Sequence, residues 1–210
     1  MNERSDFSLP SSLHVACLMK KKLIQPDWWN FLKGFWRSPG AVGSITPSSA
    51  WLVQATLAAS NVSQADTIVE FGPGTGVFTD EIIRQMKPDA RLFVFEVDHD
   101  FCSRLQARIS DSRVQIIEDS AAEVKTYLEK ADITQIDCLV SGVPFVSLPG
   151  ALAAKILGTV RDILAPNGVA VAYQYSPLRL GMFKKYFPKA RIVRYVLRNV
   201  PPALVFRLTK

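Results

Sequence analysis

The stretch IVEFGPGTG, residues 68–76, decides the fold of this chain. Residues 67–71 form a short apolar run rich in β-branched side chains, which is typical of a buried parallel strand. Gly72, Gly74 and Gly76 lack a Cβ, so the backbone can turn sharply there and approach a ligand closely. The helix predicted over residues 77–86 presents its N-terminal amide groups to this loop. Together these features predict a site for a nucleotide-like ligand.

The rest of the chain repeats this alternation of strand and helix. Apolar runs predict strands at residues 67–71, 91–97, 114–117, 136–140, 169–175, 190–196 and 203–209, and helices are predicted at 48–59, 77–86, 99–109, 120–130, 149–164 and 177–187. Asp98 is placed to cap one helix, and Ser120 with Glu123 forms a capping-box pattern. The pattern predicts an α/β fold with a Rossmann-like, seven-stranded, mostly parallel sheet. The last two strands have no helix between them, so an antiparallel C-terminal strand is expected.

Acidic residues fall at the ends of the first three predicted strands. In open α/β sheets the ligand lies across these C-terminal strand ends, beside Glu70 here. Glu96 comes about twenty residues after the glycine loop, where a carboxylate can accept hydrogen bonds from both ribose hydroxyls. Asp119 is placed to accept from an adenine amino group. The series favours a nucleoside site over an ordinary glycine-rich turn, although each acid alone could be a helix cap or a solvated loop residue.

Residues 13–39 form an unusual N-terminal segment after a polar tail, residues 1–12, that is expected to be disordered. Pro26-Asp27 is a plausible helix start. The aromatic and aliphatic residues that follow occupy one arc of roughly 160° on a helix, opposite a Lys/Arg face. Such a composition predicts an amphipathic helix lying in lipid headgroups, while a helix packed on the domain is the alternative. The expected membrane residues are Lys20, Lys21, Lys22, Trp28, Trp29, Phe31, Leu32, Phe35 and Trp36. The main domain is expected over residues 40–210.

Charge is distributed unevenly along the chain. The net charge is +6, from 25 basic and 19 acidic residues, and no acidic residue follows Asp162. A wholly basic C-terminal quarter suits an anionic partner, either nucleic acid or an anionic membrane surface. A solvated basic face with no partner is the alternative.

The remaining composition indicates no metal and no membrane span. Cys17, Cys102 and Cys138 lack metal-ligand spacing and are typical of thiols in a reducing compartment. His14 and His99 have no neighbours at zinc-ligand spacing. No apolar run reaches the ~18 residues that a transmembrane helix needs. The N-terminal charge order does not fit a signal peptide, so a cytosolic or peripheral protein is expected.

The motifs EFGPGTG, FEVD and ED at the three strand ends resemble the cofactor sites of class I S-adenosylmethionine-dependent methyltransferases. The resemblance implies S-adenosylmethionine as cofactor and S-adenosylhomocysteine as product. It places Glu70 and the three glycines at the methionine portion and Glu96 at the ribose. It assigns Asp119, with Ser120, to the adenine, and it adds Ser44 to the cofactor-binding set.

Two subfamilies compete within this resemblance. Ribosomal RNA adenine dimethylases carry Asn-Leu-Pro-Tyr at strand four, whereas this chain has SGVPF at residues 141–145, and their helical C-terminal extension is not expected here. Short bacterial phospholipid N-methyltransferases, and related ornithine lipid enzymes, resemble the chain over nearly its whole length. The shared stretches include VGSITPSS at 42–49, SGVP at 141–144 and RNVPPA at 198–203. The lipid enzymes are therefore the better match.

A lipid amine has a pKa near ~10 and must lose a proton before it attacks a methyl group. The sequence shows no strong base, so the expected catalytic work is orientation of the amine. The Ser141 hydroxyl, the carbonyls of residues 141–143 and a phenol are the expected acceptors. Tyr173 and Tyr175 alternate on strand five, only one is expected to face the site, and the resemblance favours Tyr175. The expected headgroup contacts are Phe145, Arg198 and Asn199, with Arg198 suited to a phosphate or carboxylate.

The sequence thus predicts a lipid-headgroup N-methyltransferase, with phosphatidylethanolamine as the first substrate and ornithine lipid as the second. Its expected partners are anionic membrane lipids, and its expected place is the inner face of the cytoplasmic membrane. The alternatives are an rRNA adenine N6-methyltransferase and a cofactor-binding membrane protein without turnover. Nucleic acid is disfavoured as a partner, and the sequence does not indicate an oligomeric state.

Overall fold

Seven strands and their connecting helices make up the part of the chain that the computed structural model describes, residues 47–210. The strands are β1 (Thr67–Phe71), β2 (Arg91–Glu96), β3 (Val114–Glu118), β4 (Ile136–Ser141), β5 (Leu164–Gln174), β6 (Arg191–Val196) and β7 (Ala203–Leu208). The helices are α3 (Pro47–Ala58), α4 (Val77–Gln85), α5 (His99–Arg108), α6 (Val124–Lys130), α7 (Gly150–Ile163) and α8 (Leu180–Tyr186). Short 3-10 turns lie at Val62–Gln64, Ala121–Glu123 and Pro177–Arg179. The predicted tail, amphipathic helix and Ser44 lie outside the described residues.

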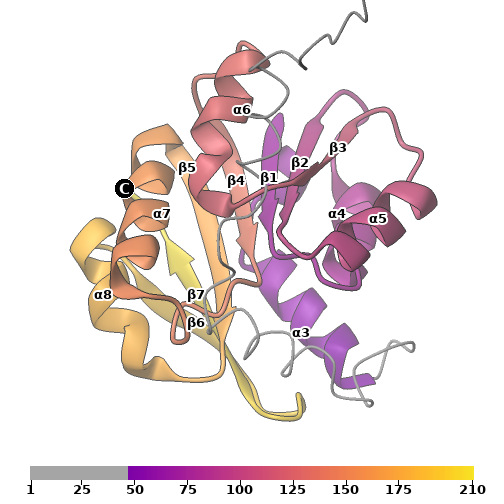
Figure 1. Cartoon of the computed structure of the whole chain (residues 1–210). Helices are drawn as coiled ribbons and strands as arrows, with labels where there is room; N and C mark the ends of the chain where they lie inside the picture. Colours follow the sequence, from indigo (N-terminus) through magenta and orange to yellow (C-terminus); the bar gives the residue numbers. More distant parts are fainter. Residues whose placement is uncertain (1–46) are drawn as a thin grey trace, which may run out of the picture. The chain divides into compact units, whose positions relative to one another are not determined.

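The strands form one sheet in the order β3-β2-β1-β4-β5-β7-β6 (Figure 1). The pairs β1–β2, β2–β3, β1–β4 and β4–β5 are parallel, and β7 is antiparallel to both β5 and β6. The mostly parallel sheet with an antiparallel C-terminal strand is therefore confirmed. The strand order reverses between β1 and β4, which is where open α/β sheets bind their ligands.

The helices cover both faces of this sheet (Figure 1). On one face, apolar residues of α3 and α4 pack on side chains from β1, β2, β4, β5 and β7 in a single buried cluster. Tyr173 of β5 belongs to this cluster, and its ring stacks on Phe78 of α4 with centroids 5.0 Å apart. On the other face, α7 contacts both α6 and α8. The buried apolar runs of the strands are thus explained by helices on both sides.

Two local predictions differ from the structure. Strand five was expected from residue 169, but β5 begins at Leu164, which pairs with Ile136 before a register shift brings Val169 opposite Cys138. The capping box at Ser120 is replaced by a 3-10 turn. Ser120 Oγ accepts from the backbone N–H of Ala122 at 3.2 Å, and the Glu123 carboxylate binds Lys155 instead of returning to Ser120. The cap at Asp98 is confirmed, since its carboxylate accepts from Asp100 and Phe101.

None of the helices within residues 47–210 has the length and apolar character needed to cross a membrane.

Candidate active site at the carboxyl ends of β1 and β4

The glycine loop lies between the ends of β2 and β4. Gly72, Gly74 and Gly76 have φ angles of 65°, 56° and 85°, in the left-handed region that glycine adopts without steric cost. The backbone N–H of Gly72 donates to the Phe95 carbonyl at 2.9 Å, and that of Gly142 donates to the Phe71 carbonyl at 2.8 Å. These bonds fix the glycine loop at the carboxyl end of β1, just before the first turn of α4.

Glu70 is a buried carboxyl group with an unused oxygen. Its side chain is 1% exposed, and Oε2 has no hydrogen-bond partner among the described residues. Burial raises its pKa to about 8, the nearby Thr79 side chain lowers it, and the negative charges of Glu96 and Asp80 add to the rise. A buried acceptor without a donor is costly, so this oxygen points to a ligand that supplies one.

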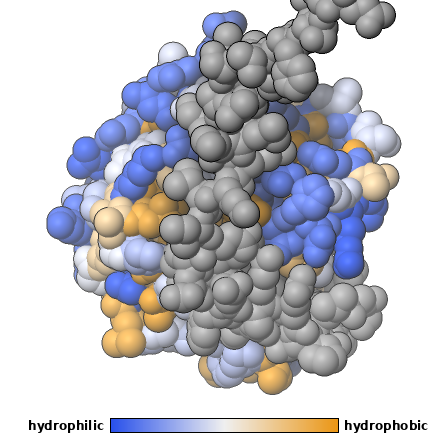
Figure 2. Space-filling view, viewed as in Figure 1, coloured by the Kyte–Doolittle hydropathy of each residue, from blue (hydrophilic) through white to orange (hydrophobic). Residues whose placement is uncertain are grey.

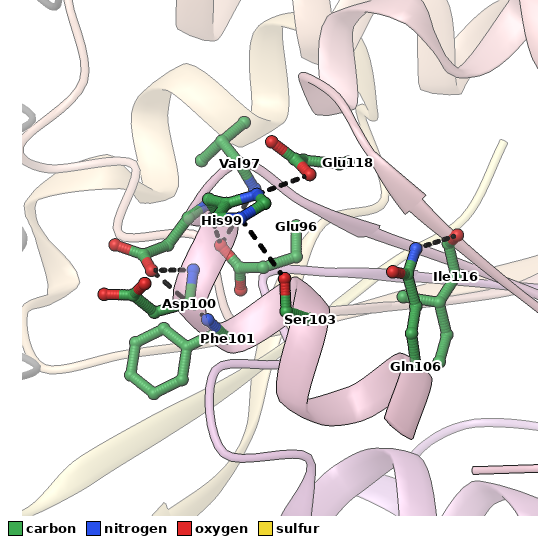
Figure 3. A network of polar contacts seen from close by, with 10 residues as sticks. Glu96, Val97, His99, Asp100, Phe101, Ser103, Gln106, Ile116 and Glu118 are labelled. Atoms are coloured by element: carbon green, nitrogen blue, oxygen red, sulfur yellow. Dashed lines mark hydrogen bonds and ion pairs between the residues drawn. The ribbon is translucent and has the colours of Figure 1, made fainter. Parts of the chain in front are cut away.

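Glu96 holds the loop from the end of β2, and its carboxylate also accepts from the backbone of the residues that follow it (Figure 3). Its Oε2 accepts from the N–H of Gly74 at 3.1 Å, and its Oε1 accepts from the N–H groups of Val97 and Asp98 at 2.9 Å each. Burial raises the pKa of Glu96, while these three backbone donors lower it. In the same view, the exposed His99 ring lies between Glu118, at 2.9 Å, and Ser103. Glu118 raises the pKa of His99.

Asp119 follows β3 and is oriented by two donors. Oδ1 accepts from the N–H of Ser120 at 2.7 Å, and Oδ2 accepts from the Tyr127 hydroxyl at 2.9 Å. The Tyr127 ring packs edge-to-face on Phe95, with centroids 5.6 Å apart. Each carboxylate oxygen keeps a second lone pair, so the group can still accept from a ligand. Tyr127 was not singled out from the sequence, and only its position about two helical turns after Ser120 indicated this role.

The loop after β4 faces the glycine loop. Ser141 is 1% exposed, its Cα pairs with Phe71 of β1, and its Oγ accepts from the N–H of Val143 at 3.3 Å. A Cβ on Gly142 would lie 2.7 Å from both the Gly72 carbonyl oxygen and the Tyr173 hydroxyl oxygen. Glycine at 142 therefore lets the two loops meet and gives the Tyr173 phenol its space beside them.

Tyr173 and Tyr175 lie on the same side of the sheet, with ring centroids 6.3 Å apart and planes at 77°. The premise that these two side chains alternate between faces was wrong, since their rings lie together at the end of β5, and which of them faces a substrate stays a prediction. Tyr173 is buried, and its pKa is raised by burial and by the charges of Tyr175, Glu70 and Glu96. Tyr175 is 41% exposed and hydrogen-bonds Asn199, and burial raises its pKa. The structure brings the Tyr173 hydroxyl to the glycine loop, and the predicted role of Tyr175 in orienting the amine stays a prediction.

The expected headgroup residues have structural partners of their own. Phe145 is buried and packs edge-to-face on Phe183 of α8, with centroids 5.3 Å apart. The Arg198 guanidinium lies 4.8 Å from the centre of the Trp51 ring. The Asn199 side chain donates to the Pro201 carbonyl at 2.6 Å. Their headgroup roles stay predictions.

Gln174 is a residue that the sequence reasoning undervalued. It is 3% exposed, and its Nε2 donates to the Val143 carbonyl at 2.8 Å. That carbonyl also accepts from the N–H of Phe145 at 2.9 Å. Both of its lone pairs are engaged, so the Val143 carbonyl is no longer an acceptor for a substrate amine, contrary to expectation.

The remaining predicted residues lie outside the described part of the chain. These are Ser44 of the cofactor set and the membrane set of Lys20, Lys21, Lys22, Trp28, Trp29, Phe31, Leu32, Phe35 and Trp36. Within residues 47–210, no three His, Cys, Asp or Glu side chains gather as a metal site would require.

Comparison with known proteins identifies the family. The model of the ribosomal RNA adenine dimethylase family matches residues 48–161. An ornithine lipid N-methyltransferase from Singulisphaera acidiphila is 31% identical over 84% of this chain and 93% of its own length. The chain therefore belongs to the family of S-adenosylmethionine-dependent methyltransferases that this model describes and that includes relatives acting on lipid. Ribosomal RNA small subunit methyltransferase A from Thermosynechococcus vestitus is 27% identical over 54% of this methyltransferase. That match spans only 39% of the Thermosynechococcus enzyme.

Solved structures support the same fold for the methyltransferase. N-methyltransferase NodS from Bradyrhizobium japonicum, in complex with S-adenosyl-L-homocysteine, superposes with a TM-score of 0.60 at 16% identity. The superposition covers 79% of this chain and 88% of NodS. The 16S rRNA methyltransferase RsmC from T. thermophilus superposes with a TM-score of 0.56 at 18% identity, covering 81% and 44% of the two chains.

The residues of the methyltransferase fit S-adenosylmethionine. The glycine loop brings bare backbone to the end of β1, and the orphaned Oε2 of Glu70 can accept from the ligand's ammonium group. Glu96 and Asp119 stand at the next two strand ends, both oriented by donors. We expect Glu70 at the methionine portion, Glu96 at the ribose and Asp119 at the adenine.

Proposed function

We propose that this methyltransferase acts on the amine of a membrane-lipid headgroup, with ornithine lipid as the first substrate to test and phosphatidylethanolamine as the second. The observation that carries the proposal is the similarity to the S. acidiphila ornithine lipid N-methyltransferase, which extends over 93% of that enzyme. The similarity to the Thermosynechococcus rRNA enzyme covers a much smaller share of the relative. The substrate order inferred from the sequence is therefore reversed.

The loop after β4 supports a lipid amine better than adenine. A short Ser141 hydroxyl stands where the adenine dimethylases carry an Asn amide, so this position offers no amide acceptor for a planar base. S-adenosylmethionine supplies an electrophilic methyl group when bound. The chain's own part is to hold the acceptor nitrogen in line with that group, which favours reaction through orientation. Ser141 Oγ and the Tyr173 hydroxyl are the acceptors that we assign to this task.

A test uses the full chain expressed in a bacterium that makes phosphatidylethanolamine and an introduced ornithine lipid, but no phosphatidylcholine. Mass spectrometry of the total lipids is expected to show methylated ornithine lipid or methylated phosphatidylethanolamine. Glu70→Ala and Asp119→Ala variants, expressed at matched levels, serve as controls and are expected to lack these species. Unmodified lipids in a host where the wild-type protein binds S-adenosylmethionine would refute the proposal.

The second candidate function is methylation of ribosomal RNA. It is favoured by the family model that matches residues 48–161 and by the basic C-terminal quarter. Small ribosomal subunits lacking their adenine methylation, incubated with the purified protein and labelled S-adenosylmethionine, provide the direct comparison. Label in RNA and none in lipid would favour this function. Cofactor binding with no label in either substrate would favour the non-catalytic alternative.

We place the methyltransferase at the inner face of the cytoplasmic membrane, bound peripherally through anionic lipids. The support is chemical, since lipid amines stay in the bilayer and the chain carries a net charge of +6. Salt-sensitive recovery with the membrane fraction of its host would support this placement, and full recovery in the soluble fraction at low salt would oppose it.

A further inference from the structure

The exposed apolar side chains of residues 47–210 gather at one edge of the sheet. All of the large ones except Trp51 lie at, or in the segments that follow, the carboxyl ends of β2, β4, β5 and β6: Val97, Val146, Tyr175, Leu178, Tyr195, Leu197 and Val200. Scattered exposed apolar residues are ordinary, but a gathering at one edge indicates a contact surface. Figure 2 shows hydrophobic surface along the lower margin of the molecule, where Figure 1 draws the turn between β6 and β7.

In the β6–β7 turn, residues 197–202, large apolar side chains are exposed to solvent while a polar side chain is buried. Leu197 and Val200 are 75% and 83% exposed. Of the two polar residues between them, Asn199 turns toward the protein: it is 5% exposed, donates to the Pro201 carbonyl and hydrogen-bonds Tyr175. Arg198 is exposed, and its guanidinium lies 4.8 Å from the centre of the Trp51 ring of α3. The contacts of Arg198 and Asn199 thus hold the turn in a conformation that leaves Leu197 and Val200 exposed to a partner.

The charges around the turn indicate the chemistry of that partner. Arg198 lies in the turn, and Arg179, which donates to the Val146 carbonyl at 2.9 Å, lies on the neighbouring loop after β5. No acidic residue occurs in the sequence after Asp162, whereas Glu118 ends β3 and Asp119 follows it, on the far side of the sheet from β6. An apolar tip flanked by arginines complements an anionic bilayer, whose headgroups are negative and whose interior is apolar.

The turn also lies at the same edge as the cofactor site. Strand β6 runs in the same direction as β5, since both are antiparallel to β7. Its carboxyl end therefore lies on the side where Glu70 comes just before the end of β1 and Ser141 ends β4. We propose that Leu197 and Val200 insert into the headgroup region of an anionic membrane and turn the active-site edge toward it. The inference rests on the proposed lipid substrate and adds the surface by which the protein reaches it.

The test measures binding of the full chain to phosphatidylcholine vesicles with and without phosphatidylglycerol. The Leu197→Ser/Val200→Ser variant is expected to lose about tenfold or more in affinity for the anionic vesicles, because two large apolar groups are removed. Ile133→Ser is the matched control, since this partly buried residue lies in the segment before β4, at the opposite edge, and it is expected to bind as the wild type does. Unchanged affinity of the double variant would overturn the proposal.

A second measurement separates this inference from the proposed function. Methyl transfer to lipid dispersed in detergent needs the active site but no bilayer, so the double variant is expected to retain it. Loss of vesicle binding in the double variant, with no lipid methylated by the wild type in any form, would refute the function and leave the docking surface standing. Loss of transfer in detergent as well as in vesicles would show that the substitutions damage the site, and would overturn the inference.

A third measurement asks what covers the turn. A nitroxide attached to Val200→Cys, in a chain with Cys17→Ser, is expected to be reached by a water-soluble relaxing agent in solution and by oxygen when anionic vesicles are added. A label shielded from the relaxing agent before vesicles are added would show that residues 1–46 or a second copy of the chain cover the turn. That result would also overturn the proposal.

Discussion

The Glu96 carboxylate accepts a hydrogen bond from the backbone N–H of Gly74 at 3.1 Å, so the end of β2 holds the glycine loop that follows β1. The same carboxylate accepts from Val97 and Asp98, and an ionised group accepts all three without competition from a proton of its own. The residue predicted to bind the ribose therefore also shapes the loop on which the cofactor rests.

Glu96→Gln tests this coupling. The amide has one acceptor oxygen, and its NH₂ group would face a backbone donor, so the free energy of unfolding is expected to fall by about 1–3 kcal/mol. Urea unfolding of the ligand-free protein provides the measurement. Glu81→Gln is the matched control, because Glu81 pairs with the exposed Arg84 on the surface of α4 and its loss is expected to cost less than about 1 kcal/mol. Equal stability of Glu96→Gln and the wild type would contradict the role in the loop.

Glu70 makes stability depend on pH. In the unfolded chain its carboxyl ionises near the ordinary value of 4.5, whereas in the folded chain the pKa is about 8. Folding therefore takes up a proton between these values, so this contribution is fully present below pH 4.5 and is lost as pH rises toward 8. The Glu70→Gln variant, compared with the wild type by urea unfolding at pH 5 and pH 8, is expected to show a smaller fall in stability. Parallel pH profiles would show that Glu70 is not the source.

Cofactor binding is expected to release the same proton. An ammonium group beside Glu70 favours the carboxylate, so S-adenosylmethionine affinity should rise as pH increases toward about 8 and fall above it, where the ligand's own α-amino group loses its proton. Calorimetric titrations at pH 7 in two buffers of different ionisation enthalpy measure the proton released. Glu70→Gln should release less than the wild type, and identical heats in both buffers for the wild type would argue against proton linkage.

The strand pattern was sufficient to predict the sheet, since each apolar run could only be buried between helices. The Asp98 cap and the three acids at strand ends were also predictable, because their positions follow from where strands stop. The difference in solvent exposure between Tyr173 and Tyr175 could not be predicted from the sequence. Both lie on one face, and which of them is buried depends on Phe78 of α4 and on Asn199 of a turn formed much later in the chain.

The contribution of Gly142 was equally hidden from the sequence. Its importance comes from two groups that are distant in sequence, the Gly72 carbonyl and the Tyr173 hydroxyl. No local pattern records such a contact. The same holds for Gln174, whose amide reaches the Val143 carbonyl on the neighbouring strand's loop.

Tyr173→Phe tests the phenol assigned to the acceptor amine. The ring keeps its stacking on Phe78, so the thermal midpoint should change little, whereas kcat for methyl transfer is expected to fall about tenfold or more, within the range for a positioned polar group. Tyr175→Phe, on the more exposed ring, is the comparison and should have the smaller effect. A larger loss in Tyr175→Phe would return the role to Tyr175.

Gly142→Ala tests the contact between the two loops. The added methyl group would meet the Gly72 carbonyl, which is backbone, and the Tyr173 hydroxyl, so the glycine loop must shift and cofactor affinity should fall about tenfold or more. Gly181→Ala, where a Cβ meets nothing within 4 Å, is the matched control. Combining Gly142→Ala with Tyr173→Phe should restore only part of the affinity, since the clash with Gly72 remains. Wild-type cofactor affinity in Gly142→Ala alone would show that a methyl group fits between the glycine loop and the loop after β4.

The antiparallel strand β7 has a consequence for the order in which the protein is assembled during synthesis. β7 lies between β5 and β6, so β6 has no neighbour in the sheet until β7 has been made. Domains begin to fold while the ribosome is still extending the chain. In this protein β1 to β5 can pair as they emerge, but β6 must wait. Until β7 has been made, the edge of the growing sheet at β5 therefore stays unpaired.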